Sequence, residues 1–161
     1  MAGILQGSDL VETAIQIEKN GAAFYDEMAK SAKEESVREK ASFFAGEERK
    51  HLEIFQDMLS SVGESQPVET YPGEYTLYVK TLADQHIFTK EKDAQAQARK
   101  APSDIEAIDF ALGIERDSIL FYSEMKNFIR KGTHEAVDKI IEEERKHFRQ
   151  FAELKKQISE S

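Results

Sequence analysis

An internal repeat constrains the fold of this chain more than any other feature of the sequence. The segment 17–30 contains the strings IEK, FY and EMAK, and the segment 114–126 contains IER, FY and EMK in the same order. A second string, EERKH at residues 47–51, returns unchanged at residues 143–147. Because the same two patterns follow one another twice, we predict two copies of one structural unit related by a pseudo-twofold axis.

Each copy of the repeat has the pattern of two amphipathic helices. Apolar residues recur every three or four positions along four long stretches, which is the spacing of one helix face. The first stretch begins near Asp9 and ends near Ala32, and the link inside each copy is short. Short links favour antiparallel neighbours, so we predict two helical hairpins at about 9–62 and 103–158.

Capping residues predict where the helices begin and end. Ser36 with Glu39 has the spacing of a capping box, in which side chains satisfy the first free backbone N–H groups of a helix. The same spacing recurs at Ser103 and Glu106, which predicts the start of the third helix. Gly132 is a typical residue for a helix end, so the third helix should continue almost to that position.

The connection between the hairpins, residues 63–102, is too long for a structureless loop in a compact domain. Its first half has residues at helical spacing, namely Tyr75, Tyr78, Val79, Leu82 and His86. They predict a crossover helix that lies across the bundle, whereas the polar stretch 89–100 is expected to be mobile. The predicted fold class is therefore all-α: one domain, 1–161, built as a four-helix bundle of two antiparallel hairpins joined by a long, partly helical crossover.

Four glutamates and two histidines occupy positions that a bundle would otherwise fill with apolar residues. Glu18 lies in the middle of the apolar stripe of its helix, between Ile15 and Ala22, and Glu115 has the matching position in the second copy. Each EERKH string places a glutamate and a histidine three residues apart, with about 5 to 6 Å between their Cβ atoms on one helix face. The side chains predicted to point into the core are Glu18, Glu48, His51, Glu115, Glu144 and His147.

Four buried carboxylates require compensation, because each ionised group in a dry interior costs several kcal/mol even after relaxation. Two divalent cations would balance the four negative charges, and two neutral imidazoles would complete the coordination. Mixed oxygen and nitrogen donors with open positions suit iron or manganese, whereas zinc favours a closed tetrahedral site, although affinity alone does not exclude it. We therefore predict two iron ions, Fe²⁺ or Fe³⁺, with manganese or zinc as substitutes.

Other residues near these positions have simpler predicted roles. Tyr25 and Tyr122 lie two turns beyond the predicted glutamate ligands of their helices. They either pack in the core or act from the second coordination sphere, where they orient a carboxylate or donate an electron to an oxidised centre. His86 and His134 have no counterpart in the repeat, so they are predicted to be crossover or surface residues and not ligands. The charged residues that flank the ligands in the EERKH strings, Glu143 among them, are predicted to be solvated.

The composition excludes several classes of site and partner. The chain has no cysteine, which excludes disulfides, thiolate zinc sites and iron–sulfur clusters. Its formal charge of −9 at pH 7 argues against nucleic acid or an anionic membrane as a partner. No segment approaches the ~18 apolar residues of a membrane-spanning helix, and the first residues lack the pattern of a signal peptide. We therefore expect a cytoplasmic protein.

The IE-x5-FY and EERKH strings, with the long connection between two hairpins, resemble the rubrerythrin-like branch of the ferritin-like di-iron superfamily. One glutamate from each of two helices, plus Glu-x-x-His from each of the other two, is the donor set described for such proteins. The resemblance implies a ferritin-like bundle and a homodimer. It also implies a non-haem di-iron peroxidase or oxidase that reduces hydrogen peroxide or dioxygen in oxidative-stress defence.

Two departures from the family pattern refine these expectations. Full-length rubrerythrins have a rubredoxin-like domain with four cysteines, so this cysteine-free chain is expected to take electrons from an external donor such as a rubredoxin-type protein. Typical rubrerythrins also have a further glutamate three residues after the third-helix ligand, where this chain has Ser118, which predicts a more symmetric site. Two alternatives stay open: a ferroxidase or iron-storage protein, and a metal-binding scaffold without turnover.

Overall fold

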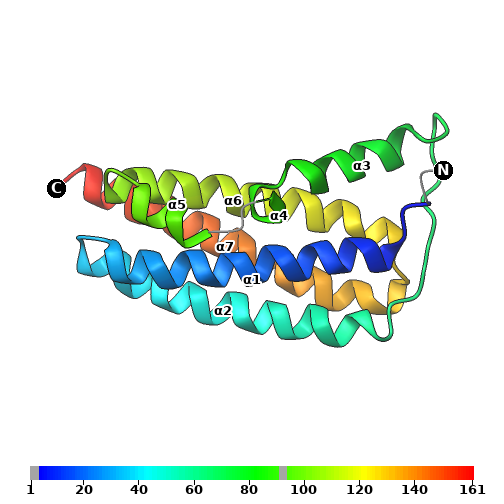
Figure 1. The fold of residues 1–161 in the computed structure, drawn as a ribbon, viewed down its shortest axis with the longest axis horizontal. Coiled ribbons are helices and arrows are strands. Elements are labelled where there is room, and N and C mark those ends of the chain that lie inside the picture. The colour runs from blue at the N-terminus through cyan, green and yellow to red at the C-terminus, as the bar shows by residue number, and fades with distance from the viewer. Residues whose placement is uncertain (1–3, 91–93) are drawn as a thin grey trace.

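Four long helices lie side by side in the computed structural model, which describes residues 4–90 and 94–161 (Figure 1). Their bounds are α1 Gly7–Ser31, α2 Glu35–Leu59, α6 Asp104–Met125 and α7 His134–Ser159. The most extensive packing is between α1 and α2 and between α6 and α7. The predicted all-α bundle of two antiparallel hairpins is therefore confirmed, and no helix in the described ranges is long and apolar enough to cross a membrane.

Two apolar clusters fill the core, one toward each end of the bundle. In α1 the first cluster ends at Ile17 and the second begins at Phe24, which leaves Glu18 between them. In α2 the buried rings of Phe44 and Phe55 belong to opposite clusters. The same interruption occurs in α6 and α7. The fold thus places the predicted polar positions at mid-bundle, where apolar packing on both sides separates them from the helix ends.

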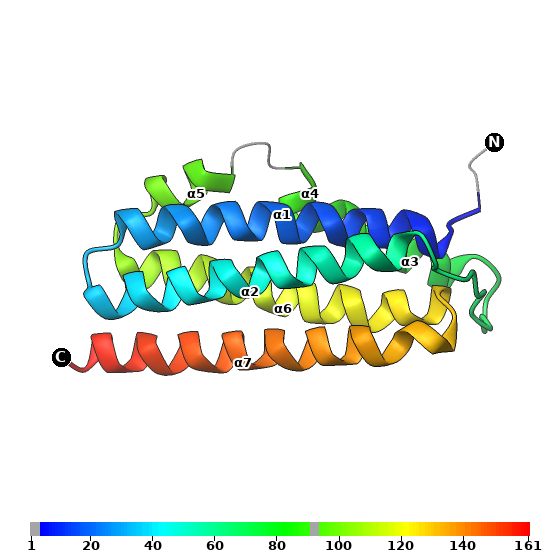
Figure 2. The same cartoon turned by 90° about the horizontal axis from the view of Figure 1, so that it is seen from below.

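The described part of the crossover contains three shorter helices. Their bounds are α3 Glu74–Gln85, α4 Ile87–Lys90 and α5 Ala94–Lys100. α3 packs on α6 and buries Val79 and Ala83, which confirms the predicted crossover helix. α5 lies along α1 in both views and buries Ala94 and Ala98, so this part of the stretch expected to be mobile is a packed helix (Figures 1 and 2). Residues 91–93 lie outside the described part of the chain.

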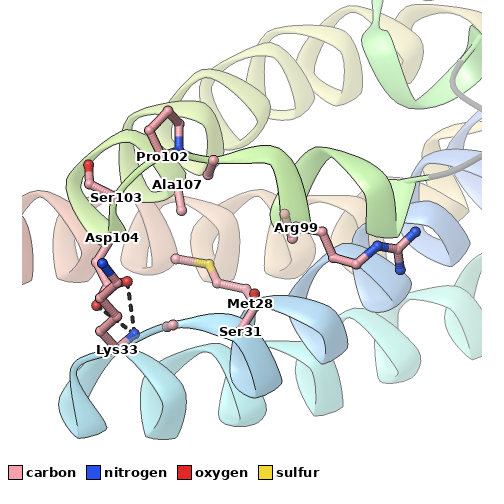
Figure 3. Close-up of a pocket in the computed structure, with 11 residues that line it drawn as sticks. Met28, Ser31, Lys33, Arg99, Pro102, Ser103, Asp104 and Ala107 are labelled. Atoms are coloured by element: carbon pink, nitrogen blue, oxygen red, sulfur yellow. Dashed lines mark hydrogen bonds between the residues drawn. The ribbon is translucent and has the colours of Figure 1, made fainter.

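The predicted capping box at Ser36 is wrong, because a tertiary contact replaces it. α2 begins at Glu35, so Ser36 already lies inside the helix. The carboxylate of Asp104, at the start of α6, accepts hydrogen bonds from the backbone N–H groups of Lys33 at 3.0 Å and Glu34 at 2.8 Å. Figure 3 shows Lys33 and Asp104 joined in this way. Asp104 thus bonds the amides of the two residues that precede α2, and this contact also joins the two hairpins.

At the third helix, the predicted start is confirmed and the predicted end is wrong. The Ser103 hydroxyl accepts a hydrogen bond from the Glu106 N–H at 3.2 Å, as expected for an N-cap. α6 ends at Met125, however, well before Gly132, and the 3₁₀ turns η1 (Lys126–Phe128) and η2 (Lys131–Thr133) follow. Between these turns the backbone pairs with the crossover, since the Arg130 N–H donates to the Gly63 carbonyl at 2.7 Å. These tertiary hydrogen bonds replace the helical ones.

Candidate metal centre

The six predicted side chains converge at mid-bundle, where each has 5% or less of its surface exposed. α1 provides Glu18, α6 provides Glu115, and α2 and α7 each provide a glutamate and a histidine one turn apart. The apolar stripes of the four helices direct these residues inward, because each donor takes a position of the stripe. The structure therefore brings together all the residues that sequence reasoning singled out, while their role as metal ligands stays a prediction.

The donor atoms form two overlapping groups. One group contains Glu18, Glu48, His51 and Glu144. The other contains Glu48, Glu115, Glu144 and His147. Within each group the donor atoms lie within 4.8 Å of one another. Glu48 and Glu144 belong to both groups, which is the arrangement that allows two carboxylates to bridge a pair of ions while each ion has one further glutamate and one histidine.

Both imidazoles direct Nδ1 toward the carboxylates. His51 Nδ1 lies 3.0 Å from Glu144 Oε1 and 3.5 Å from Glu18 Oε2. His147 Nδ1 lies 3.2 Å from Glu144 Oε2 and 3.6 Å from Glu115 Oε1. The two rings are nearly parallel, with centroids 6.0 Å apart and an interplanar angle of 22°. The pseudo-twofold symmetry predicted from the repeat is thus present in the side chains of the site as well as in the helices.

Two tyrosines orient the outer glutamates across the pseudo-twofold axis. The hydroxyl of Tyr122, on α6, donates to Glu18 Oε1 at 2.5 Å, and the hydroxyl of Tyr25, on α1, donates to Glu115 Oε1. Burial, followed by the charges of nearby glutamates, raises the pKa of both hydroxyls well above the usual value, so they keep their protons. Of the two roles left open by the sequence, the structure thus shows both core packing and carboxylate orientation.

Sequence reasoning missed the role of Glu143. Its carboxylate Oε2 lies 2.5 Å from Nε2 of the buried His51, so it is not simply solvated. A hydrogen bond donated by Nε2–H leaves the Nδ1 lone pair for the centre, which is how a carboxylate fixes the tautomer of a histidine ligand. The counterpart Glu47 is instead paired with Lys50 at 2.8 Å. The presence of a glutamate before the ligand in both EERKH strings was the signal for this position.

Without metal, protons balance the charges of the cluster. Burial and the charge of Glu144 raise the pKa of Glu48 and of Glu115 well above the usual value, which favours the protonated form of both carboxyl groups. Burial would raise the pKa of Glu144 too, but its neighbours outweigh burial and hold this pKa well below the usual value. Burial likewise disfavours protonation of His147, yet the adjacent carboxylates raise its pKa to about 10. The His51 pKa is raised for the same reason.

The residues present fit a pair of cations. Three atoms that face the cluster have no hydrogen-bond partner among the described residues: Glu18 Oε2, Glu48 Oε1 and His147 Nδ1. Buried polar atoms without partners are rare in proteins and call for an explanation such as a bound ion. Four carboxylates and two imidazoles, with no cysteine thiolate in the sequence, suit iron or manganese. Cations at this position would satisfy the three orphaned atoms and replace the protons.

Comparison with known proteins decides the family. The rubrerythrin family model matches residues 9–155, which include both hairpins, the crossover and all six donor residues. The chain belongs to the rubrerythrin family. No curated protein matches the sequence. Among solved structures, a ferritin-like diiron-carboxylate protein from Thermotoga maritima superposes with a TM-score of 0.67 and 24% identity, over 97% of this chain and 98% of that one. The ferritin-like fold class is thereby confirmed.

The rubrerythrin-like bundle and its buried Glu/His cluster together support iron binding at this centre. A small pocket elsewhere in the bundle is separate from this centre. The pocket in Figure 3, about 50 Å³ and lined by Met28, Arg99 and Ala107 among others, lies where α5, α6 and the end of α1 meet and includes none of the six donors.

The two histidines left out of the predicted ligand set belong to neither donor group. His134 bonds the Ile129 carbonyl at 3.0 Å. His86 lies in the crossover, one of the two positions expected for it, and its side chain is buried.

Gly21 leaves the space that Glu48 occupies, which gives a testable prediction. A Cβ atom at residue 21 would lie 3.4 Å from Glu48 Oε2, so the larger side chain of Gly21→Leu would displace this shared carboxylate. We expect the variant to stay helical and to bind less iron, as measured by metal analysis and circular dichroism. Gly46→Leu, on the open side of α2, is the control because no neighbour lies within 4 Å of a Cβ there. Equal iron contents would contradict the prediction.

Metal binding should release protons. Glu48, Glu115, His51 and His147 all have raised pKa values in the metal-free protein, and each must lose its proton to act as a ligand. We therefore expect the affinity for Fe²⁺ or Mn²⁺ to increase with pH between 6 and 8, by roughly tenfold or more per unit if one or more protons leave per ion. Calorimetric titration in buffers of different ionisation enthalpy measures this release directly. A heat independent of the buffer would contradict it.

Proposed function

We propose that this protein is a non-haem di-iron oxidoreductase that reduces hydrogen peroxide, or dioxygen, in oxidative-stress defence. The observation that supports it most is the pair of donor groups that share Glu48 and Glu144. Two ferrous ions held there would supply the two electrons needed to convert one peroxide and two protons to two waters. A pair of adjacent redox ions suits such a two-electron reaction.

The residues around the centre have roles that suit this reaction. Glu143 fixes the tautomer of His51, and the two tyrosine hydroxyls hold the outer glutamates, so the ligands are positioned before the substrate arrives. The apolar clusters on both sides exclude bulk water from the centre. Because Tyr25 and Tyr122 keep their protons, they act as hydrogen-bond donors and do not add negative charge.

A surface pocket between α2 and α7 offers a route for a small oxidant. It encloses about 190 Å³ and is lined by Phe43, Glu47, Glu143, Lys146, His147 and Gln150. His147 is otherwise 3% exposed, so this pocket brings solvent to the edge of the donor cluster. Peroxide and dioxygen are small enough to enter a pocket of this volume.

Peroxide oxidation of the reduced protein tests the proposal. Anaerobically reduced, iron-loaded protein should consume one peroxide per pair of irons in a fast phase and change its absorption as the irons are oxidised. Glu144→Gln should remove that phase because the shared carboxylate loses its charge, whereas Glu142→Gln, two residues away with its side chain 60% exposed, should keep it. Peroxide decay no faster than with metal-free protein would contradict the assigned function.

We propose an external electron donor, such as a rubredoxin-type protein, and a homodimer as the assembly. A storage protein would instead form a hollow shell of many subunits and keep accumulating iron beyond the centre. Size-exclusion chromatography and iron titration distinguish the two. A dimer whose iron content saturates at the centre, and whose oxidised form is reduced by a rubredoxin, supports the enzyme. A large shell that mineralises iron supports storage.

A further inference from the structure

His86 lies beside the metal centre although it is not one of the six donors. It is the C-cap residue of α3 and lies between α3 and α4, and only 1% of its surface is exposed. Its Nε2 atom lies 3.0 Å from the Ser118 hydroxyl oxygen on α6. Ser118 is itself buried, one turn after Glu115 on the same helix. The crossover therefore brings a buried imidazole onto the helix face that contributes to the centre.

The hydrogen bonds of His86 determine its tautomer. The backbone N–H of Phe88 donates to Nδ1 at 3.3 Å, so Nδ1 holds a lone pair. In a neutral ring Nε2 then has the hydrogen, and it donates to Ser118. Burial lowers the pKa of His86 to about 4, despite the opposing effect of the Glu144 charge, so the ring is neutral near pH 7. His86 is thus a fixed donor toward Ser118.

Accepting this bond frees the hydroxyl hydrogen of Ser118 for another acceptor. Other hydroxyls on these helices donate to the carbonyl four residues earlier, as Ser31 does to Glu27 at 2.9 Å and Ser123 does to Ile119 at 2.7 Å. Within the described ranges, no hydrogen bond of this kind is formed by Ser118. Its hydroxyl is therefore a buried donor that lacks a protein acceptor, which is costly unless another group accepts the bond.

The internal repeat shows which part of the centre Ser118 faces. Its counterpart is Gly21, where a Cβ atom would lie 3.4 Å from the carboxylate of Glu48. The counterpart of Glu48 is Glu144, so the pseudo-twofold axis places the Ser118 side chain on the Glu144 side of the centre. The effect of the Glu144 charge on His86 agrees with this placement. At this position one copy of the repeat has Gly21, which has no side chain, and the other copy has Ser118, whose hydroxyl is bonded to His86.

We propose that the Ser118 hydroxyl, held in position by His86, donates a hydrogen bond to a small anion that enters the metal centre. The inference rests on the proposed iron pair and adds to it a positioning device on one side only, because Gly21 provides no equivalent on the other. The chemical class of ligand is a small anion with an exposed lone pair, such as hydroperoxide or its stable analogue azide. Ser118 contacts that ligand, and His86 acts through Ser118.

Azide titration of the oxidised, iron-loaded protein tests this proposal. A hydrogen bond to an anion contributes enough that Ser118→Ala should weaken azide binding by about tenfold, while Ser118→Thr should keep it within about twofold of wild type. His86→Leu should weaken azide binding several-fold, because the hydroxyl can then turn to the helix backbone. His86→Gln, whose amide can still donate, should restore it. The double variant Ser118→Ala/His86→Leu should bind azide no more weakly than Ser118→Ala alone.

Other measurements separate this role from a merely structural one. Nitrogen NMR of the metal-free protein should show His86 as the neutral Nε2–H tautomer, and the Nδ1–H tautomer would overturn the proposal. If Ser118→Ala lowers the melting temperature but leaves azide affinity unchanged, the pair only holds the crossover in place and the proposal is wrong. A protein that binds iron and azide but is not oxidised by peroxide contradicts the proposed function alone, so the two failures are distinguishable.

Discussion

Glu48→Ala and Glu144→Ala should each abolish binding of both iron ions, whereas Glu18→Ala and Glu115→Ala should each leave one ion bound. The difference follows from the two donor groups. Both groups contain Glu48 and Glu144, whereas Glu18 belongs to one group and Glu115 to the other. Loss of an outer-shell partner costs roughly 10- to 100-fold in metal affinity, so loss of a shared ligand should cost at least ~100-fold for each ion. Iron content per chain after gel filtration measures the outcome.

The exposed glutamates of the same helices are the controls for this experiment. Glu142→Ala removes a carboxylate from α7 whose side chain is 60% exposed and paired with Arg145, so iron content should be unchanged. Circular dichroism must show that all variants keep the helical bundle. If Glu144→Ala retained one ion while Glu18→Ala lost both, Glu144 would not be shared, and the assignment of bridging carboxylates would be wrong.

Removal of the metal should lower the melting temperature by roughly 10 to 20 °C. A ligand at 100 times its dissociation constant stabilises the folded state by about 2.7 kcal/mol, so two ions contribute about 5 kcal/mol. For a chain of this size each kcal/mol shifts the melting temperature by roughly 2 to 4 °C. Thermal unfolding with excess Mn²⁺ and with chelator gives the comparison. A variant that lacks both shared carboxylates, Glu48→Gln/Glu144→Gln, should show no response to either.

The pH dependence of stability should reverse when the metal is removed. In the metal-free protein His147 has a pKa raised to about 10, against ~6.5 unfolded, so its stabilising effect is complete below pH ~6.5 and is lost as the pH rises through 10. Glu48 and Glu115 also have raised pKa values, so the stability that their protonation provides is lost in the same direction. Metal-free protein should thus melt at a lower temperature at pH 9 than at pH 6.

With metal bound, the same change of pH should not destabilise the protein. The ligands are then deprotonated by the ions, and competition from protons decreases as pH rises. We expect the difference in melting temperature between loaded and metal-free protein to be larger at pH 9 than at pH 6. A metal-free protein that became more stable toward pH 9 would show that the cluster is not protonated, and the charge distribution described for it would be wrong.

The donor cluster was predictable because its signal is local and duplicated. Glu18 lies on an apolar stripe, and Glu48 with His51 lies one turn apart on another, so helix periodicity alone directs them inward. The second copy makes coincidence implausible. Glu143 was not predicted, because it occupies an outward helix position and becomes a partner of His51 only when α7 packs beside α2. The only sign of this role in the sequence is that a glutamate occupies the same position in both EERKH strings.

The helix ends and the crossover show where local rules fail. Ser36 has the spacing of a cap, yet Asp104 from the other hairpin accepts hydrogen bonds from the amides of Lys33 and Glu34, and the helix starts at Glu35. The third helix stops at Met125 because the chain beyond it pairs with residues 63–65 of the crossover. A polar stretch without periodicity still forms α5, since α1 offers a surface on which Ala94 and Ala98 are buried. In each case the deciding partner is distant in sequence.

By itself the sequence determined the all-α class, the duplicated hairpins and the six donors, because periodicity and repetition are properties of neighbouring residues. Only the tertiary structure decided that Glu48 and Glu144 are shared, that the tyrosines reach across the axis, and that His86 meets Ser118 beside the centre. The physical reason is that a hydrogen bond or a shared ligand depends on distances between helices, and those distances are set by the packing of side chains far apart along the chain.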